Sequence, residues 1–186
     1  GDINEMEEVG STDKVAVVVE HNRITEENDG IRFSNIADTY FILKDRAGNR
    51  EIVSKIIDTT PNGDMGDWRH FARSVKKVIK RFNPNKLIVV LWNHGNGYFG
   101  IAYDDVSGNH MNVSEIGKAL KEISSFYGKK IDIFAMDACL MQMAEVVTEI
   151  KDYAKFIVAS QELIPGLGYP YDEILRAINQ TSDIRK

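Results

Sequence analysis

The sequence has very little cysteine. Only Cys139 occurs among the 186 residues, and a single thiol cannot form a disulfide within the chain. Zinc sites built on cysteine use several thiolate ligands, so this class of metal site is excluded as well. The role of the one thiol therefore needs an explanation of its own.

Long apolar runs and an excess of basic residues are also absent. No run approaches the roughly 18 apolar residues of a membrane span, and residues 1–5 lack the basic and apolar parts of a signal peptide. Lys and Arg number 23 against 28 Asp and Glu, which gives a net charge of −5. We therefore expect no nucleic acid partner, no membrane span and no attraction to anionic membranes.

The pattern of apolar residues indicates one α/β domain with a substantial core. Short apolar segments typical of buried strands lie at residues 15–19, 87–92, 131–136 and 156–160. Helical patterns lie at residues 67–82, 114–128, 141–153 and 171–178, with Ser114 as the expected N-cap of the second. The first strand is expected to end at the polar residues 21–23, and residues 40–43 and 51–57 are expected to form an edge hairpin around a turn at 45–49. Strands that alternate with helices favour a parallel sheet.

Two of the predicted strands end at reactive residues. The strand at 87–92 leads into His94, and the strand at 131–136 leads into Cys139. If these strands are parallel, both residues lie at the carboxyl edge of the sheet, where α/β folds place their ligand sites. A nearby imidazole can activate a thiol, and a helix starting at Cys139 would favour its thiolate. The alternatives are a buried, inert cysteine and a structural loop histidine.

Further candidates flank this pair. The Gly95 and Cys139 N–H groups could stabilise an oxyanion. Asp137 could support a helix N-terminus or form the acidic floor of a specificity pocket, and the sequence leaves both open. His21 could line the same edge, whereas His70 and His110 are expected on the surface.

Acidic residues in the loops do not form a recognisable metal motif. Asp64, Asp67 and the pair Asp104 and Asp105 lack the spacing of a twelve-residue calcium loop. We therefore expect them to be solvated loop residues and expect no metal site.

These motifs together resemble the clostripain family of cysteine peptidases, family C11, in the clan that contains caspases, gingipains and legumains. The order and spacing of the matching segments are specific, and they cover nearly the whole chain. They are Asp2–Met6, Val9–Val15, Gly66–Phe71, Leu91–Gly97, Met136–Met141 and Ser160–Gly166.

The resemblance implies a caspase-like α/β/α sandwich with a mostly parallel central sheet. It also implies an endopeptidase that cleaves after Arg or Lys through a His94/Cys139 dyad and a thioester acyl-enzyme, with Gly95 and Cys139 N–H groups as oxyanion hole. In this clan the histidine often makes no hydrogen bond to the cysteine and mainly protonates the leaving amine, so the general base stays open. Asp137 matches an acidic position that contributes to the pocket for the P1 cation, and bidentate pairing would favour arginine over lysine.

No cofactor is expected, and no motif supports a calcium requirement, which varies within the family. The expected partners are proteins or peptides with Arg or Lys at P1 and a second chain that arises by proteolytic processing. The resemblance also implies bacterial secretion or a place in the cell envelope.

The sequence departs from the family pattern in three ways. Family members usually carry an apolar strand before residues 4–6 and continue beyond residues 184–186. Residues 1–186 are therefore expected to form one caspase-like domain that is incomplete at an N-terminal strand and a C-terminal extension. Many relatives are also cut after a basic residue in the loop following the histidine, but no Lys or Arg lies between His94 and Lys118.

Two other functions remain open at this stage. A caspase-like scaffold without a competent pocket, or a fragment of a processed peptidase, would bind partners without catalysis. An acyl-transferring transpeptidase would use the same thioester but pass the acyl group to an amine instead of water.

Overall fold

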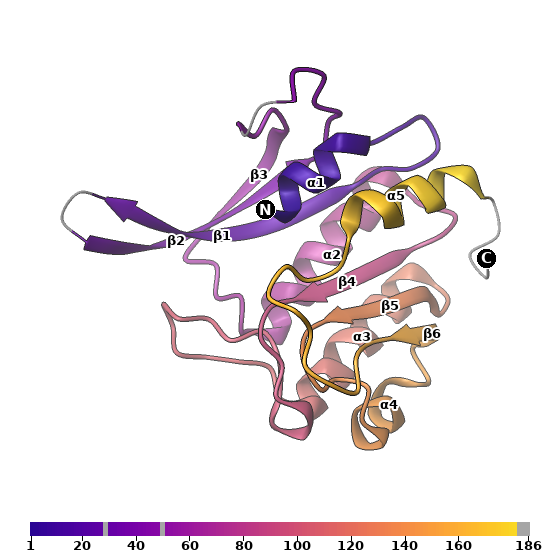
Figure 1. The fold of residues 1–186 in the computed structure, drawn as a ribbon. Helices are drawn as coiled ribbons and strands as arrows, with labels where there is room; N and C mark the ends of the chain where they lie inside the picture. The colour runs from indigo at the N-terminus through magenta and orange to yellow at the C-terminus, as the bar shows by residue number, and fades with distance from the viewer. Residues whose placement is uncertain (28–29, 49–50, 182–186) are drawn as a thin grey trace.

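The structure is a computed structural model that describes residues 1–27, 30–48 and 51–181 (Figure 1). The chain begins with one short helix and three strands, after which helices and strands alternate. The first elements are α1 (Asp2–Val9), β1 (Val18–Glu27), β2 (Gly30–Phe41) and β3 (Lys55–Pro61). The later elements are α2 (Trp68–Phe82), β4 (Ile88–Trp92), the 3-10 turn η1 (Gly97–Phe99), α3 (Val113–Tyr127), β5 (Ile131–Asp137), α4 (Ala144–Ile150), β6 (Ala154–Val158) and α5 (Tyr171–Gln180).

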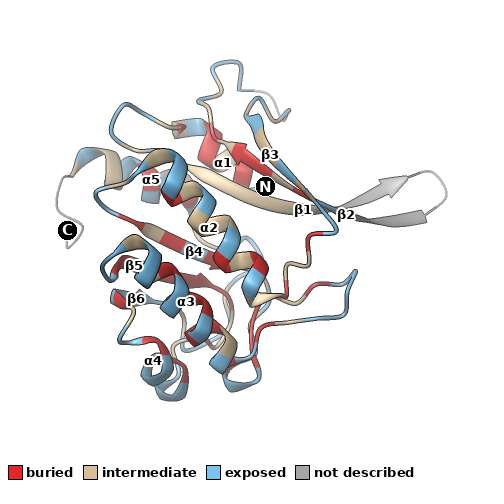
Figure 2. Ribbon diagram, turned by 180° about the vertical axis from the view of Figure 1, so that it is seen from behind, coloured by how far each residue is buried: buried red, intermediate tan, exposed pale blue. Residues whose placement is uncertain are grey.

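The three later strands form a parallel sheet in the order β4-β5-β6. This confirms the predicted strands and their parallel pairing, and β5, the central strand, is almost wholly buried. Helices α2 and α3 pack against each other. They lie behind the strands in Figure 1 and in front of them in the reversed view of Figure 2. The predicted α/β class is confirmed.

The three early strands form a separate antiparallel sheet in the order β1-β2-β3. The prediction that the first strand spans residues 15–19 and ends at residues 21–23 is wrong, because β1 begins at Val18 and its ladder with β2 continues to Glu27. The edge hairpin is confirmed where Tyr40 pairs with Ile56 and Phe41 with Lys55. Residue 49 of its predicted turn lies outside the described residues.

Helix ends follow local capping chemistry. Asp67 caps α2, accepting a hydrogen bond from Arg69 N–H, and the helix ends at Asn83 as predicted. Helix α3 starts earlier than the predicted cap, because Asn112 and Glu115 form a reciprocal capping box. Gly128 ends it in the left-handed conformation, at φ 78°.

A second, smaller core lies beneath α1 and α5, which pack against each other. Helix α1 has only two strongly apolar buried positions, Ile3 and Met6, so its periodicity is too short to detect in the sequence. Its buried Glu7 accepts hydrogen bonds from the backbone of Val53 and Ser54 and from the Ser54 hydroxyl. This carboxylate fastens the long connection between β2 and β3 to the helix.

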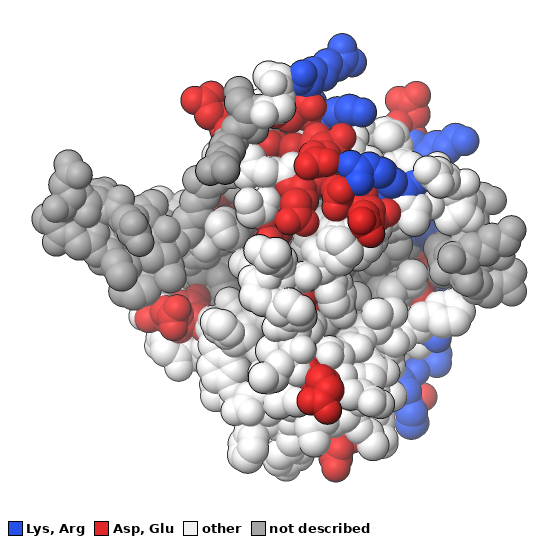
Figure 3. All heavy atoms as spheres, viewed as in Figure 1, with Lys and Arg blue, Asp and Glu red and all other residues white. Residues whose placement is uncertain are grey.

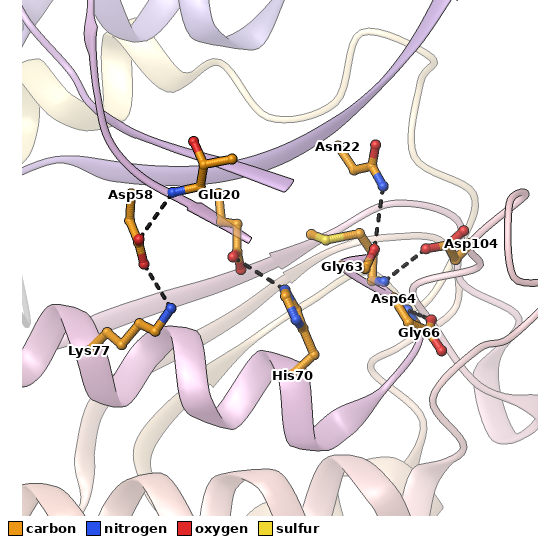
Figure 4. A network of polar contacts seen from close by, with 11 residues as sticks. Glu20, Asn22, Asp58, Gly63, Asp64, Gly66, His70, Lys77 and Asp104 are labelled. Carbon is orange, nitrogen blue, oxygen red and sulfur yellow. Dashed lines mark hydrogen bonds and ion pairs between the residues drawn. The ribbon is translucent and has the colours of Figure 1, made fainter. Parts of the chain in front are cut away.

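Polar contacts join the antiparallel sheet to α2 (Figure 4). His70 Nε2 lies 3.2 Å from Glu20 Oε1 of β1, and both side chains are largely buried. The expectation that His70 lies on the surface is therefore wrong. At the other end of the helix, Lys77 donates to Asp58 of β3 at 2.7 Å.

Asp132 joins the starts of the three parallel strands, although it is completely buried. Its carboxylate accepts hydrogen bonds from Leu87 N–H at 3.0 Å and from Lys155 Nζ at 2.7 Å. Burial alone would raise the pKa of Asp132, but the bonds from Lys155 and Leu87 and the charge of Lys86 lower it. Burial and the nearby Asp132 carboxylate together raise the pKa of Tyr127 to about 12.

We expect Asp132→Asn to lower the free energy of unfolding by about 2 kcal/mol at pH 7, because it removes hydrogen bonds to a charged group. A carboxyl with a lowered folded pKa stabilises the fold above its unfolded pKa and loses this contribution as pH falls. The difference from wild type should therefore shrink below about pH 4. Urea unfolding at several pH values measures this, with the exposed Asp152→Asn as control. A pH-independent difference would contradict the explanation.

Candidate functional site

The loop that follows β4 holds His94 at the carboxyl edge of the parallel sheet. Asn93 has φ 146°, which is a rare conformation for a residue with a side chain. The His94 carbonyl accepts a hydrogen bond from Ala102 N–H at 3.1 Å, and Gly95 bridges to Ile101. The His94 side chain itself is exposed. The backbone thus fixes the position of the residue and leaves its imidazole accessible.

Two aspartates support this loop from behind (Figure 4). Asp104 is buried and accepts hydrogen bonds from the N–H groups of Met65, Val106 and Ser107. Asp64 accepts from Gly66 N–H and from side chains of the same loop. The expectation of a solvated loop residue is therefore wrong for Asp104, whereas Asp64 is half-buried and Asp105 is exposed as expected. Within residues 1–27, 30–48 and 51–181, no group of three or more His, Cys, Asp or Glu is placed to hold a metal ion.

Two further histidines lie near the loops and strands of this edge. His110 stacks on Tyr103 with ring centroids 4.7 Å apart and is half-buried. His21 lies within β1, and its ring centroid is 6.3 Å from that of Trp92, the residue that ends β4.

Across the described part of the chain, every helix is too short or too polar to traverse a bilayer.

Cys139 lies in a turn directly after β5. The predicted helix at residues 141–153 begins only at Ala144, so the helix support expected for the Cys139 thiolate is not present at the residue itself. The turn is held instead by the segment after β6, where Leu140 N–H donates to the Glu162 carbonyl at 3.1 Å. From the same segment, Ile164 N–H donates to Cys139 Sγ at 3.3 Å.

The two loops are in direct contact because Trp92 and Asp137 pair at the ends of β4 and β5. A Cβ atom at Gly95 would lie 2.5 Å from the Cys139 carbonyl oxygen, so only glycine permits this approach. Among the described residues, the N–H groups of Gly95 and Cys139 donate to no protein acceptor. Two neighbouring free amides are the donor set that stabilises an oxyanion.

Asp137 is 3% exposed and lies two residues before Cys139. Its Oδ2 accepts a hydrogen bond from the Tyr171 hydroxyl at 2.8 Å and from Tyr169 N–H at 3.0 Å. Its Oδ1 is buried without a hydrogen-bond partner in the described part of the chain. Gly168 packs its backbone against the carboxylate. The expected helix N-terminal role for Asp137 is not supported, because α4 begins seven residues later.

Burial and the Asp137 carboxylate shift the pKa values of neighbouring groups. Burial raises the pKa of Tyr171, and so do its hydrogen bond to Asp137 and the Asp137 charge. Burial and then the Asp137 charge raise the pKa of Tyr169. Burial and then repulsion from Asp137 raise the pKa of Asp2 at the start of α1. The tyrosine hydroxyls therefore stay protonated and act as donors.

An open cavity of about 490 Å³ lies beside these residues, between the end of β6 and the start of α5. Its walls are mainly apolar, and they include Leu163, Ile164, Gly168 and Tyr169. Ile164 N–H bonds to Cys139 Sγ and Gly168 lies against the Asp137 carboxylate, so the cavity borders the segment that contacts both groups.

Acidic side chains gather on the surface over α1 and the start of α5 (Figure 3). The first turns of these helices contribute Asp2, Glu5, Asp172 and Glu173. This surface adjoins Asp137, because the Asp137 carboxylate is close enough to raise the pKa of Asp2. A cationic ligand would be attracted to this side of the molecule.

The fold is found in solved cysteine proteases. A secreted C11 cysteine protease from Bacteroides thetaiotaomicron, bound to an irreversible peptide inhibitor, has a TM-score of 0.78 at 24% identity, over 98% of this chain and 49% of its own. The secreted C11 protease iotapain from the same organism has a TM-score of 0.72 at 16% identity, over 98% and 52%. An inactive zymogen C11 protease from Parabacteroides distasonis has a TM-score of 0.68 at 22% identity, over 92% and 45%. The α/β architecture is thus the caspase-like fold of C11 proteases.

The sequence comparison agrees. A sequence model of the clostripain family, Peptidase_C11, matches residues 1–185, and the chain belongs to this family. Clostripain from Hathewaya histolytica is 28% identical over an alignment of 135 residues, and the match covers 62% of this chain and 25% of clostripain. The chain spans a quarter of clostripain and about half of each solved relative.

We expect Gly95→Ala to destabilise the protein by about 2 kcal/mol or more, because the new methyl group overlaps backbone and the two loops must separate. Gly166→Ala is the matched control, since a Cβ at Gly166 meets nothing within 4 Å. Thermal unfolding measures both variants. Equal melting temperatures for Gly95→Ala and Gly166→Ala would show that the loops are not in tight contact.

Proposed function

We propose that this chain carries the catalytic site of a cysteine endopeptidase that cleaves after Arg or Lys. The observation that carries the proposal is the contact between the Gly95 and Cys139 backbones beside the thiol of Cys139, where neither N–H group donates to any residue that the structure describes. Family membership and the fold of solved cysteine proteases support the reaction class.

In the proposed mechanism, the Cys139 thiol loses its proton to solvent, with no residue assigned as the base. The thiolate Sγ then attacks the scissile carbonyl carbon and forms a sulfur–carbon bond. The carbonyl oxygen becomes an oxyanion, which the N–H groups of Gly95 and Cys139 stabilise. The carbon–nitrogen bond then breaks, and His94 protonates the leaving amine. Water attacks the thioester, which releases the carboxylic acid and restores the thiol. No cofactor takes part in these steps.

Contacts around Cys139 are compatible with His94 acting mainly as an acid. Among the described residues, the hydrogen bond to Sγ comes from Ile164 N–H rather than from His94. His94 is exposed, so its imidazole can exchange protons with water and reach a leaving amine.

Asp137 is the proposed partner of the P1 cation. A buried carboxylate oxygen without a hydrogen bond costs free energy, and a cationic ligand would remove this cost. The acidic surface over α1 and α5 supports a cationic substrate, because it raises the local concentration of positive charge.

Location and processing are further parts of the proposal. Two of the similar solved structures are described as secreted proteases, and we infer secretion or a place in the cell envelope for this protein. A third is described as an inactive zymogen. A second chain produced by proteolytic processing is therefore a proposed partner.

We expect peptide amides with Arg or Lys at P1 to be cleaved, whereas those with Asp or Leu are not. Cys139→Ala should reduce cleavage to background, because no other thiol is present. His94→Ala should lower the rate on amides by about a hundredfold and on activated esters by less, since an ester leaving group needs no proton. Fluorogenic substrates of both kinds measure this, with and without calcium.

Several outcomes would contradict the proposal. Cleavage that survives Cys139→Ala would exclude the thiol, and an absence of cleavage would favour a binding scaffold. An added amine that is incorporated in preference to water would indicate a transpeptidase. Equal losses on amide and ester in His94→Ala would exclude the acid role of His94.

We expect Asp137→Asn to lower kcat/KM for Arg and Lys substrates by about a hundredfold, because the cation loses its buried counter-charge. A substrate with neutral citrulline at P1 is the matched control and should be cleaved equally, if slowly, by both proteins. Steady-state kinetics measure the ratio. An equal loss on charged and neutral substrates would mean that Asp137 only supports the loop.

A further inference from the structure

The two oxygens of Asp137 have different surroundings. Oδ2 accepts two hydrogen bonds, from the Tyr171 hydroxyl at 2.8 Å and Tyr169 N–H at 3.0 Å. Oδ1 has no partner among the described residues and is buried. A carboxylate offers about two lone-pair positions on each oxygen, so Oδ2 is filled and Oδ1 is open.

This asymmetry decides how the carboxylate can bind a cation. A guanidinium binds a carboxylate best through two parallel hydrogen bonds, one to each oxygen. An ammonium is a compact charge that needs only one. With Oδ2 filled, Asp137 accepts hydrogen bonds from either group through Oδ1 alone, and the usual two-oxygen advantage of arginine is lost.

We propose that Tyr171 is a positioning residue that makes Asp137 present a single oxygen to the P1 side chain, so that lysine is accepted about as well as arginine. The inference rests on the proposed function, because it gives Asp137 the role of binding the P1 cation. Near-equal cleavage after lysine and arginine replaces the preference for arginine that the sequence led us to expect.

Tyr171 is held firmly in this role. It is the first residue of α5 and is 6% exposed, within the core formed with α1 and β2. Its N–H donates to Glu5 Oε2 at 3.3 Å, so its backbone is fixed as well as its ring. Burial and Asp137 raise its pKa, which keeps the hydroxyl protonated and donating.

The turn that precedes Tyr171 lies against the open oxygen, Oδ1 of Asp137. A Cβ at Gly168 would lie 2.8 Å from Oδ2 and 3.5 Å from Oδ1, so the Gly168 backbone closes the carboxylate from the cavity side. Gly168 N–H bonds to the Pro165 carbonyl in a turn whose Gly166 and Leu167 are exposed. The proposal requires this turn to shift for a P1 side chain to reach Oδ1, whereas Tyr171 lies outside the turn, in α5.

Tyr171→Phe tests the proposal, because it frees one lone pair of Oδ2 and retains the ring. We expect wild type to cleave matched Arg and Lys substrates with kcat/KM values within about threefold of each other. Tyr171→Phe should raise the Arg to Lys ratio about tenfold, as one added hydrogen bond to a charged group would.

Tyr169→Phe is the matched control, because its hydroxyl donates to the Met136 carbonyl and not to Asp137. It removes the same atom from the same segment and should leave the Arg to Lys ratio unchanged. A loosened loop would lower both kcat/KM values together, so the ratio separates the positioning role from a structural one.

The outcomes are distinct. An active wild type whose ratio does not change in Tyr171→Phe overturns this inference and leaves the proposed function intact. A wild-type preference for Arg over Lys above about thirtyfold in kcat/KM also overturns this inference and leaves the proposed function intact. That measurement uses wild type alone, so it does not depend on whether Tyr171→Phe folds. A wild type that cleaves neither substrate overturns the proposed function and this inference with it.

Discussion

The parallel pairing of β4 with β5 is the constraint on which the candidate site depends. The pairing ends with Trp92 beside Asp137, so the residues that follow each strand emerge side by side. Gly95 then approaches the Cys139 carbonyl more closely than any residue with a side chain could. A shift of one residue in this register would turn every side chain of the shifted strand to the other face and separate the two N–H groups that donate to no described residue.

The same pairing is fixed at its other end by Asp132. Its carboxylate bonds to the backbone before β4 and to Lys155 of β6, so one buried charge aligns all three strands. The antiparallel sheet contributes in a different way. Through Glu20 it contacts His70 of α2, and the loop before that helix bonds to the loop after His94. Support for the site therefore comes from both sheets.

Much of this arrangement could be predicted from the sequence, because it follows from patterns along the chain. The apolar strands before His94 and Cys139 and the caps at Asp67 and Gly128 depend on neighbouring residues. Buried polar residues were the main source of error. Nothing near His70 in the sequence distinguishes a buried, bonded side chain from a solvated one, because its partner Glu20 lies far away along the chain. Asp104 bonds to the nearby Val106 and Ser107, but the bond from Met65, which ties it to another loop, spans 39 residues.

The surroundings of Asp137 were the part of the site that the sequence could not provide. Tyr169 and Tyr171 lie more than 30 residues further along the chain, and one uses its backbone while the other uses its hydroxyl. A motif records that an acidic residue precedes Cys139 by two positions, but it does not record which of its oxygens is already bonded. Since recognition of a cation depends on the free lone pairs, the chemistry of this carboxylate is determined by α5 as much as by Asp137 itself. Residues that fill one oxygen of a carboxylate can therefore change what it recognises without touching the ligand.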